Sequence, residues 1–173
     1  MTREELCARI DGVLETYFGS TVKSCEPYGN GHINDTFLVV TDKRYILQRM
    51  NHEIFTNPEK LIENVERVTG FLKQQIEKNG GNAKRETLNL VETAEGKHYF
   101  VDSIGSYWRM YLFIEDATSF DQVNKPEDFY ESAVAFGNFQ NLLMDFDAKQ
   151  LYEAIPNFHN TPSRYQTFLK AVE

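Results

Sequence analysis

Cysteine and positive charge are both scarce in this sequence. The 173 residues include only 2 cysteines, and Cys7 and Cys25 are too far apart in sequence to form a closely spaced metal-binding motif. Lys and Arg total 18 against 26 Asp and Glu, so the formal net charge is -8. An acidic chain of this kind is not expected to bind nucleic acid or an anionic membrane surface.

Long apolar runs are missing too. The first residues, MTREE, are polar, and no run approaches the roughly 20 apolar residues that a membrane-spanning helix needs. The sequence therefore predicts a cytoplasmic protein without membrane contacts. Hydrophobic residues still make up 41% of the chain, and 13 Phe and 9 Tyr are enough for a folded core.

The hydrophobic pattern predicts an α+β chain in two parts, residues 1–115 and 116–173. The first part is expected to hold a helix ending at Gly19, a long helix from Pro58 to Gly80, and strands at 22–26, 36–41, 44–50, 87–92, 97–102 and 107–114. The segments 87–92 and 97–102 are expected to form a hairpin. Helices are predicted to begin near Pro126, Asp147 and Thr161 in the second part.

Helical spacing also predicts which faces are buried. In the long helix we expect a core face of Leu61, Val65, Val68 and Leu72, with Ile62, Thr69 and Ile76 alongside. In the helix that starts at Pro126, the apolar stripe is Phe129, Ala133, Phe136, Gln140 and Leu143. The last helix has its stripe at Tyr165, Phe168, Leu169 and Val172, and that stripe is still running where the sequence stops.

The most informative segment is the glycine loop, Gly29 to Asn34, between the first two expected strands. Two glycines separated by one residue leave backbone N–H groups unobstructed, and clustered amides favour anions such as phosphate. A Gly-Asn-Gly hairpin tip is also common turn chemistry. The loop by itself therefore leaves both interpretations open.

Six segments taken in order resemble the aminoglycoside phosphotransferase and choline kinase superfamily, and most closely its N-acetylhexosamine 1-kinase branch. They are GNGHIN at 29–34, YILQRMN at 45–51, NVERVT at 64–69, WRMYLFIE at 108–115, FGNFQ at 136–140 and FHNTP at 158–162. The resemblance spans nearly the whole chain. It implies a protein-kinase-like fold: an N-terminal lobe at 1–115, with an antiparallel sheet of about five strands, a long helix and the hinge, and the start of a helical C-terminal lobe at 116–173.

The resemblance also implies transfer of the ATP γ-phosphate to a sugar hydroxyl, the anomeric hydroxyl of an N-acetylhexosamine in the closest branch. The nucleotide-binding residues that it implies are Gly29, Asn30, Gly31, His32, Ile33, Asn34, Gln48, Glu66, Leu112 and Ile114. Gln48 stands where protein kinases have a lysine, and Arg49 should face the other side of the strand. His32 is a candidate for contact with phosphate or sugar.

Several of these positions have a second interpretation. Gln48 could be an ordinary strand-surface residue, Glu66 a solvated residue beside the apolar stripe, and Leu112 and Ile114 plain core residues. Glu66 is preferred to Glu63 because Glu63 has Arg67 four residues later, which is a common surface pair.

The catalytic half of a kinase site is absent from the sequence. The superfamily has a His-x-Asp-x-x-x-x-Asn loop, but none of the 4 histidines here is followed two positions later by Asp. The base and the magnesium ligands are therefore expected outside this chain, which should be inactive alone. The alternatives are a non-catalytic nucleotide-binding or interaction module, or a kinase for choline, homoserine or an aminoglycoside.

Overall fold

The computed structural model describes residues 3–19, 21–118, 122–123 and 125–172, and in the first helix the side chains from Arg9 onward. The elements, in order, are α1 (Arg3–Phe18), β1 (Ser24–Pro27), β2 (Asp35–Val40), β3 (Arg44–Arg49), α2 (Pro58–Lys78), α3 (Ala83–Glu86), β4 (Phe100–Val101), β5 (Tyr107–Leu112), α4 (Pro126–Leu142), the 3-10 turn η1 (Ala148–Gln150) and α5 (Thr161–Val172).

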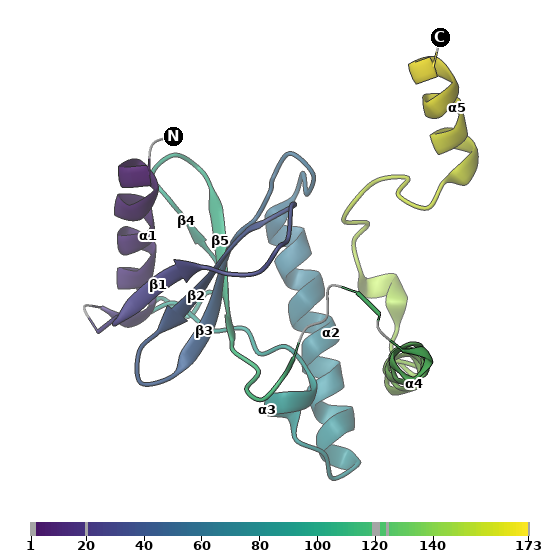
Figure 1. Cartoon of the computed structure of the whole chain (residues 1–173), viewed down its shortest axis with the longest axis horizontal. Helices are drawn as coiled ribbons and strands as arrows, with labels where there is room; N and C mark the ends of the chain where they lie inside the picture. The colour runs from purple at the N-terminus through teal and green to yellow at the C-terminus, as the bar shows by residue number, and fades with distance from the viewer. Residues whose placement is uncertain (1–2, 20, 119–121, 124, 173) are drawn as a thin grey trace.

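In the described part of the chain, one antiparallel five-stranded sheet carries the first half of the fold. Its strand order is β1-β2-β3-β5-β4. α1 lies on one side of this sheet and α2 on the other, while α4 and α5 lie beyond α2 (Figure 1). The α+β class and the lobe of a sheet with one long helix, both predicted from the sequence, are confirmed.

The main core lies between α1 and one face of the sheet. Alternate residues of the central strands point to this face. The buried cluster consists of Ile10, Val13, Leu14, Phe37, Val39, Leu47, Trp108 and Met110. Since successive strand residues point to opposite faces, the residues between them lie on the face away from α1.

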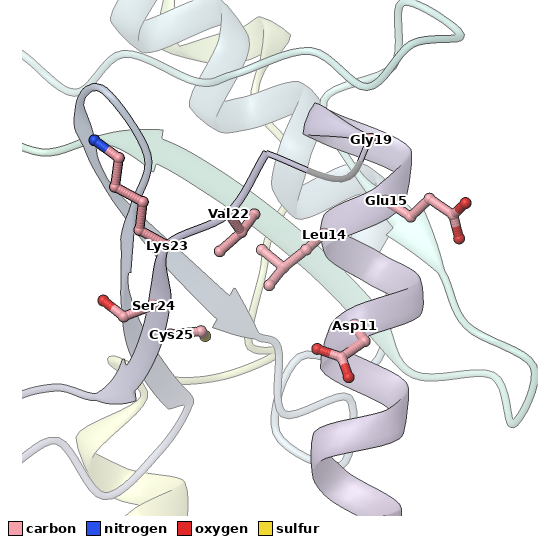
Figure 2. Close-up of a pocket in the computed structure, with 8 residues that line it drawn as sticks. All are labelled: Asp11, Leu14, Glu15, Gly19, Val22, Lys23, Ser24 and Cys25. Atoms are coloured by element: carbon pink, nitrogen blue, oxygen red, sulfur yellow. The ribbon is translucent and has the colours of Figure 1, made fainter.

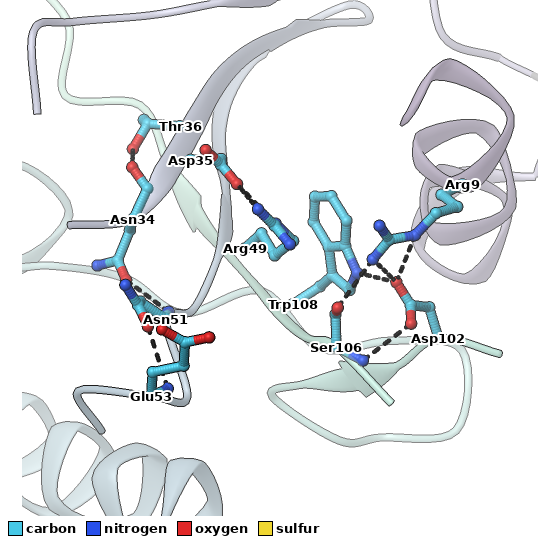
Figure 3. A network of polar contacts seen from close by, with 10 residues as sticks. All are labelled: Arg9, Asn34, Asp35, Thr36, Arg49, Asn51, Glu53, Asp102, Ser106 and Trp108. Atoms are coloured by element: carbon cyan, nitrogen blue, oxygen red, sulfur yellow. Dashed lines mark hydrogen bonds and ion pairs between the residues drawn. The ribbon is translucent and has the colours of Figure 1, made fainter. Parts of the chain in front are cut away.

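A polar network fixes α1 to the β4–β5 edge of the sheet. Asp102 accepts hydrogen bonds from Arg9 Nε at 3.0 Å, from Trp108 Nε1 at 2.8 Å and from the Ser106 backbone N–H at 2.9 Å (Figure 3). The side chains of Asp102 and Arg9 are only 5% and 11% exposed. Burial alone would raise the pKa of Asp102, but the hydrogen bonds from Arg9 and Trp108 outweigh it and hold that pKa below its ordinary value.

The hairpin predicted from 87–92 and 97–102 is wrong. β4 pairs with β5, where Phe100 lies opposite Trp108, and Leu90 makes an isolated bridge to Tyr111 on the same strand. Both segments thus bind one edge of β5 in succession and are joined by a turn at Thr93. The short helix α3 was not predicted. Asn82 caps it by accepting a hydrogen bond from the Lys84 N–H.

The long helix begins as predicted, with the Asn57 side chain accepting from the Lys60 N–H and Pro58 in the first turn. Its most buried face differs from the expected one. Ile62, Thr69, Leu72 and Ile76 are buried, whereas Leu61, Val65 and Val68 are only half-buried. The buried stripe is therefore rotated toward the positions that were expected to flank it.

The helices of the second part form where they were predicted but leave their apolar stripes exposed. Phe129, Tyr130 and Phe136 on α4 are 67%, 68% and 68% exposed, and Tyr165 and Phe168 on α5 are also exposed. Residues Leu142 and Leu143, at the end of α4, pack against the α2 cluster. Among the helices of the described residues, none combines the length and apolar character needed to cross a bilayer.

Candidate functional site

The face of the sheet away from α1 carries two adjacent rows of side chains. The register aligns Thr36 on β2 with Gln48 on β3, and Gln48 with Arg109 on β5. This polar row is followed, two residues along each strand, by the row Leu38, Ile46 and Tyr111. An apolar platform therefore lies beside a polar row that contains a cation.

The polar row is connected by hydrogen bonds between side chains. Gln48 Nε2 donates to Thr36 Oγ1 at 3.2 Å. Its carbonyl oxygen, Oε1, accepts from Arg109 Nε at 3.1 Å and from Arg109 Nη2 at 3.0 Å. The guanidinium also lies over the Tyr111 ring, with its carbon 5.1 Å from the ring centroid. Gln48 is thus held between two neighbouring strands, and it orients the arginine.

Arg109 was missed by the sequence reasoning. It is half-buried, and burial lowers the pKa of its guanidinium. Among the described residues, no carboxylate forms an ion pair with it. The signal that could have found it is a charged residue at the centre of the apolar strand YWRMYL.

The sequence predicted that Arg49, the residue after Gln48, faces the other side of β3, and the structure agrees. Arg49 Nε donates to Asp35 Oδ2 at 2.6 Å, and in the register Arg49 lies opposite Trp108 (Figure 3). Trp108 belongs to the core on the α1 side. Arg49 therefore stands on the opposite face from Gln48.

The glycine loop joins β1 to β2, and most of it is exposed. Gly29 has φ +78°, a conformation that an L-residue adopts only with strain. Asn34 is half-buried, and its Oδ1 accepts from the Asn51 N–H at 3.0 Å, so the end of the loop is bound to the segment after β3 (Figure 3). His32 and Ile33 line a polar pocket of about 310 Å3 with that segment. The positions Asn30 and Gly31 lie at the exposed part of the loop.

Glu66 lies on α2, but its carboxylate contacts the β4 side of the lobe. Its Oε1 is 2.7 Å from His98 Nδ1, and His98 Nε2 is 3.6 Å from Glu92. The structure shows no hydrogen bond between Glu66 and Gln48, both of which are described. The two residues expected to correspond to the kinase lysine and glutamate are therefore not brought into contact.

The expected hinge residues follow β5 at the end of the sheet. Leu112 N donates to the Asn89 carbonyl at 2.9 Å, and Phe113 N donates to the Arg44 carbonyl at 3.0 Å. Ile114 lines an apolar cavity of about 480 Å3 with residues of α2 and with Phe139 of α4. Leu112 and Ile114 thus lie where the sheet leads into the helical part, on the connection expected between lobes.

Another hollow, of about 460 Å3, lies between α1 and β1 (Figure 2). Asp11, Leu14 and Glu15 of the helix line it together with Val22 and Lys23. Leu14 and Val22 point toward each other between the helix and the strand, whereas the Glu15 carboxylate points away (Figure 2). It is on the side of the sheet that α1 covers, away from Gln48 and Arg109. In the described residues, no three His, Cys, Asp or Glu side chains cluster as metal ligands would.

No protein-family model matches the chain. Among solved structures, it is similar to a spectinomycin phosphotransferase in complex with ADP and spectinomycin, with a TM-score of 0.54 and 11% sequence identity. The chain has a kinase-like fold. The match covers 96% of this chain and 47% of the phosphotransferase, so the chain spans about half the length of that protein. At this identity the likeness establishes the fold, which is the kinase-like N-terminal lobe that the motifs implied.

Proposed function

We propose that this chain is the nucleotide-binding part of an ATP-dependent kinase that phosphorylates a small-molecule hydroxyl. The observation that carries the proposal is the sheet face away from α1, where an apolar row adjoins a polar row containing Arg109. In this kinase-like lobe, Leu38 and Ile46 offer a flat apolar surface suited to the adenine base. The polar row and the amides of the glycine loop offer donors for phosphate oxygens.

The residues proposed to hold the nucleotide include all those that the motifs implied. The loop contributes Gly29, Asn30, Gly31, His32, Ile33 and Asn34. Gln48 belongs to the polar row, and Leu112 and Ile114 lie at the connection between lobes. Glu66 lies on α2. The fold likeness supports nucleotide binding, because the similar phosphotransferase was solved with ADP. Bound ATP would supply the phosphoryl group that is transferred. We propose that the catalytic base and the magnesium ligands come from residues beyond this chain.

For the acceptor we propose a sugar, specifically the anomeric hydroxyl of an N-acetylhexosamine. The support for this acceptor is the set of six sequence motifs. An aminoglycoside is the second candidate, favoured by the fold likeness to a spectinomycin phosphotransferase. A non-catalytic nucleotide-binding module is the alternative that would need neither acceptor.

Two assays test the proposal. Calorimetric titration of the 173-residue chain with ATP should show weak binding, and phosphorylation assays of the same chain should show no turnover. A panel of N-acetylhexosamines, aminoglycosides, choline and homoserine, offered to the longest protein that the gene encodes, should give phosphorylation of N-acetylhexosamine. Phosphorylation of an aminoglycoside instead would replace the acceptor assignment. A chain that binds no nucleotide would contradict the function itself.

A further inference from the structure

We infer that Arg109 supplies the phosphate-binding cation of this site, and that Gln48 is a positioning residue which orients it. Protein kinases place this cation as a lysine on the third strand. Here the third strand carries the neutral Gln48 at the matching position, and the cation stands directly opposite on the neighbouring strand β5. The inference rests on the proposed nucleotide site and names the residue that binds the phosphates there.

The first argument is the position of the guanidinium. Thr36, Gln48 and Arg109 share one row across three strands, on the face away from α1. The apolar row with Leu38 and Ile46 lies immediately beside it. The polar row lies between this platform and Asp35, where the glycine loop enters β2. A base stacked on the platform with its phosphates toward the loop therefore brings them to the polar row.

The second argument is how Arg109 is held. Two of its nitrogens, Nε and Nη2, donate to the same oxygen of Gln48, and its central carbon lies over the Tyr111 ring. A guanidinium has more N–H donors than these contacts use, and among the described residues the Nη1 group has no hydrogen-bond partner. The arginine is therefore oriented in advance and still has donors to offer.

The third argument is charge. A half-buried cation is unfavourable unless an anion compensates it, and burial already lowers the pKa of this guanidinium. A glutamate at position 48 would neutralise Arg109, and a lysine there would repel it. Glutamine orients the guanidinium and leaves its charge available. A phosphate group matches the remaining donors, because guanidinium and phosphate form paired, charge-assisted hydrogen bonds.

The test compares nucleotides that differ only in phosphate. The 173-residue chain is titrated with ATP, ADP and adenosine in EDTA at low ionic strength, so that no metal contributes. Arg109→Met should weaken ATP and ADP binding by about tenfold or more, the loss expected for a charge-assisted hydrogen bond. Adenosine affinity should be unchanged. Arg109→Lys should recover part of the ATP affinity, and Gln48→Glu should lower it without affecting adenosine.

Lys23→Met is the control, since it removes an exposed cation that borders the hollow between α1 and β1, away from this site. It should leave the affinities for all three ligands unchanged.

If the wild-type chain binds ATP and Arg109→Met binds it equally well, the inference is wrong while the proposed function stands. Equal losses for ATP and adenosine would show a purely structural role for Arg109 and also overturn it. A wild-type chain that binds neither ligand would overturn both the inference and the function. If Arg109→Met does not fold by circular dichroism, Arg109→Lys and Gln48→Glu decide.

Discussion

Asp102 shows how one residue can connect distant parts of this lobe. Its carboxylate accepts hydrogen bonds from α1 through Arg9, from β5 through Trp108, and from the backbone of the turn between β4 and β5. The carboxylate is almost fully buried, so each of these bonds lies in an environment from which water is excluded. The attachment of α1 to the sheet edge therefore depends on this charge.

Replacing the Asp102 carboxylate should destabilise the fold. Asp102→Asn is expected to lower the free energy of unfolding by about 3–5 kcal/mol, because it removes the buried charge that accepts hydrogen bonds from Arg9, Trp108 and the Ser106 N–H. Urea unfolding followed by circular dichroism measures the change. Asp145→Asn, at an exposed position on the loop after α4, is the control and should change it by less than about 0.5 kcal/mol.

The same substitution predicts a pH dependence. The pKa of Asp102 in the folded chain lies below its ordinary value, so its contribution to stability is complete above the unfolded pKa of about 3.9 and is lost as the pH falls through the folded pKa. The stability difference between the wild type and Asp102→Asn should therefore be constant near neutral pH and shrink below about pH 4. A difference independent of pH would contradict this role of the charge.

The sequence predicts which face of the sheet a strand residue points to, but not which residue lies beside it on the neighbouring strand. Alternation correctly separated Gln48 from Arg49. The partner of Gln48 is Arg109, which is 61 residues away and comes beside it only through the pairing of β3 with β5. For the same reason the contact of Glu66 with His98 was not foreseen. Such contacts depend on the register, which local periodicity does not specify.

At the scale of the element, the glycine loop makes a prediction that separates its two glycines. Gly29 has φ +78°, whereas Gly31 is outside the left-handed region and a Cβ there would meet no atom within 4 Å. Gly29→Ala should lower the free energy of unfolding by about 1–2 kcal/mol, since L-residues are strained in that region. Gly31→Ala should change it by less than about 0.5 kcal/mol. Equal effects in urea unfolding would contradict the loop conformation.

Element prediction succeeded where end signals were local. Asn57 and Pro58 mark the start of α2, and the first three strands lie close to their expected ranges. Prediction failed at the hairpin expected from 87–92 and 97–102, because residue alternation predicts a strand but not the strand with which it pairs. In this fold both segments pair with β5, which is longer and satisfies their backbone groups in succession.

At the scale of the whole molecule, the chain combines a compact lobe with helices that bury little. α1, the sheet and α2 hold the described core, while the apolar stripes of α4 and α5 are largely exposed. The sequence predicted the positions of these helices. It could not predict that their stripes would remain uncovered, because periodicity shows which face is apolar and does not show what packs on it.

The net charge of -8 is an average over the chain and does not describe the charge at the proposed site. This average disfavours nucleic acid and anionic membranes as partners, yet Arg109 provides a half-buried cation within the sheet. A nucleotide is small enough to respond to that local charge and to nearby backbone amides. The average charge of a chain is informative for large polyanions and much less so for a ligand bound at one row of side chains.

Hydrogen–deuterium exchange with and without saturating ATP tests most directly whether the nucleotide binds on the sheet face away from α1. We predict slower exchange in the glycine loop at 29–34, in β2 and β3, and in the segment 109–114, with no change at the hollow between α1 and β1. Protection confined to residues 11–25, or no protection anywhere at ATP concentrations that saturate the chain, would contradict the account.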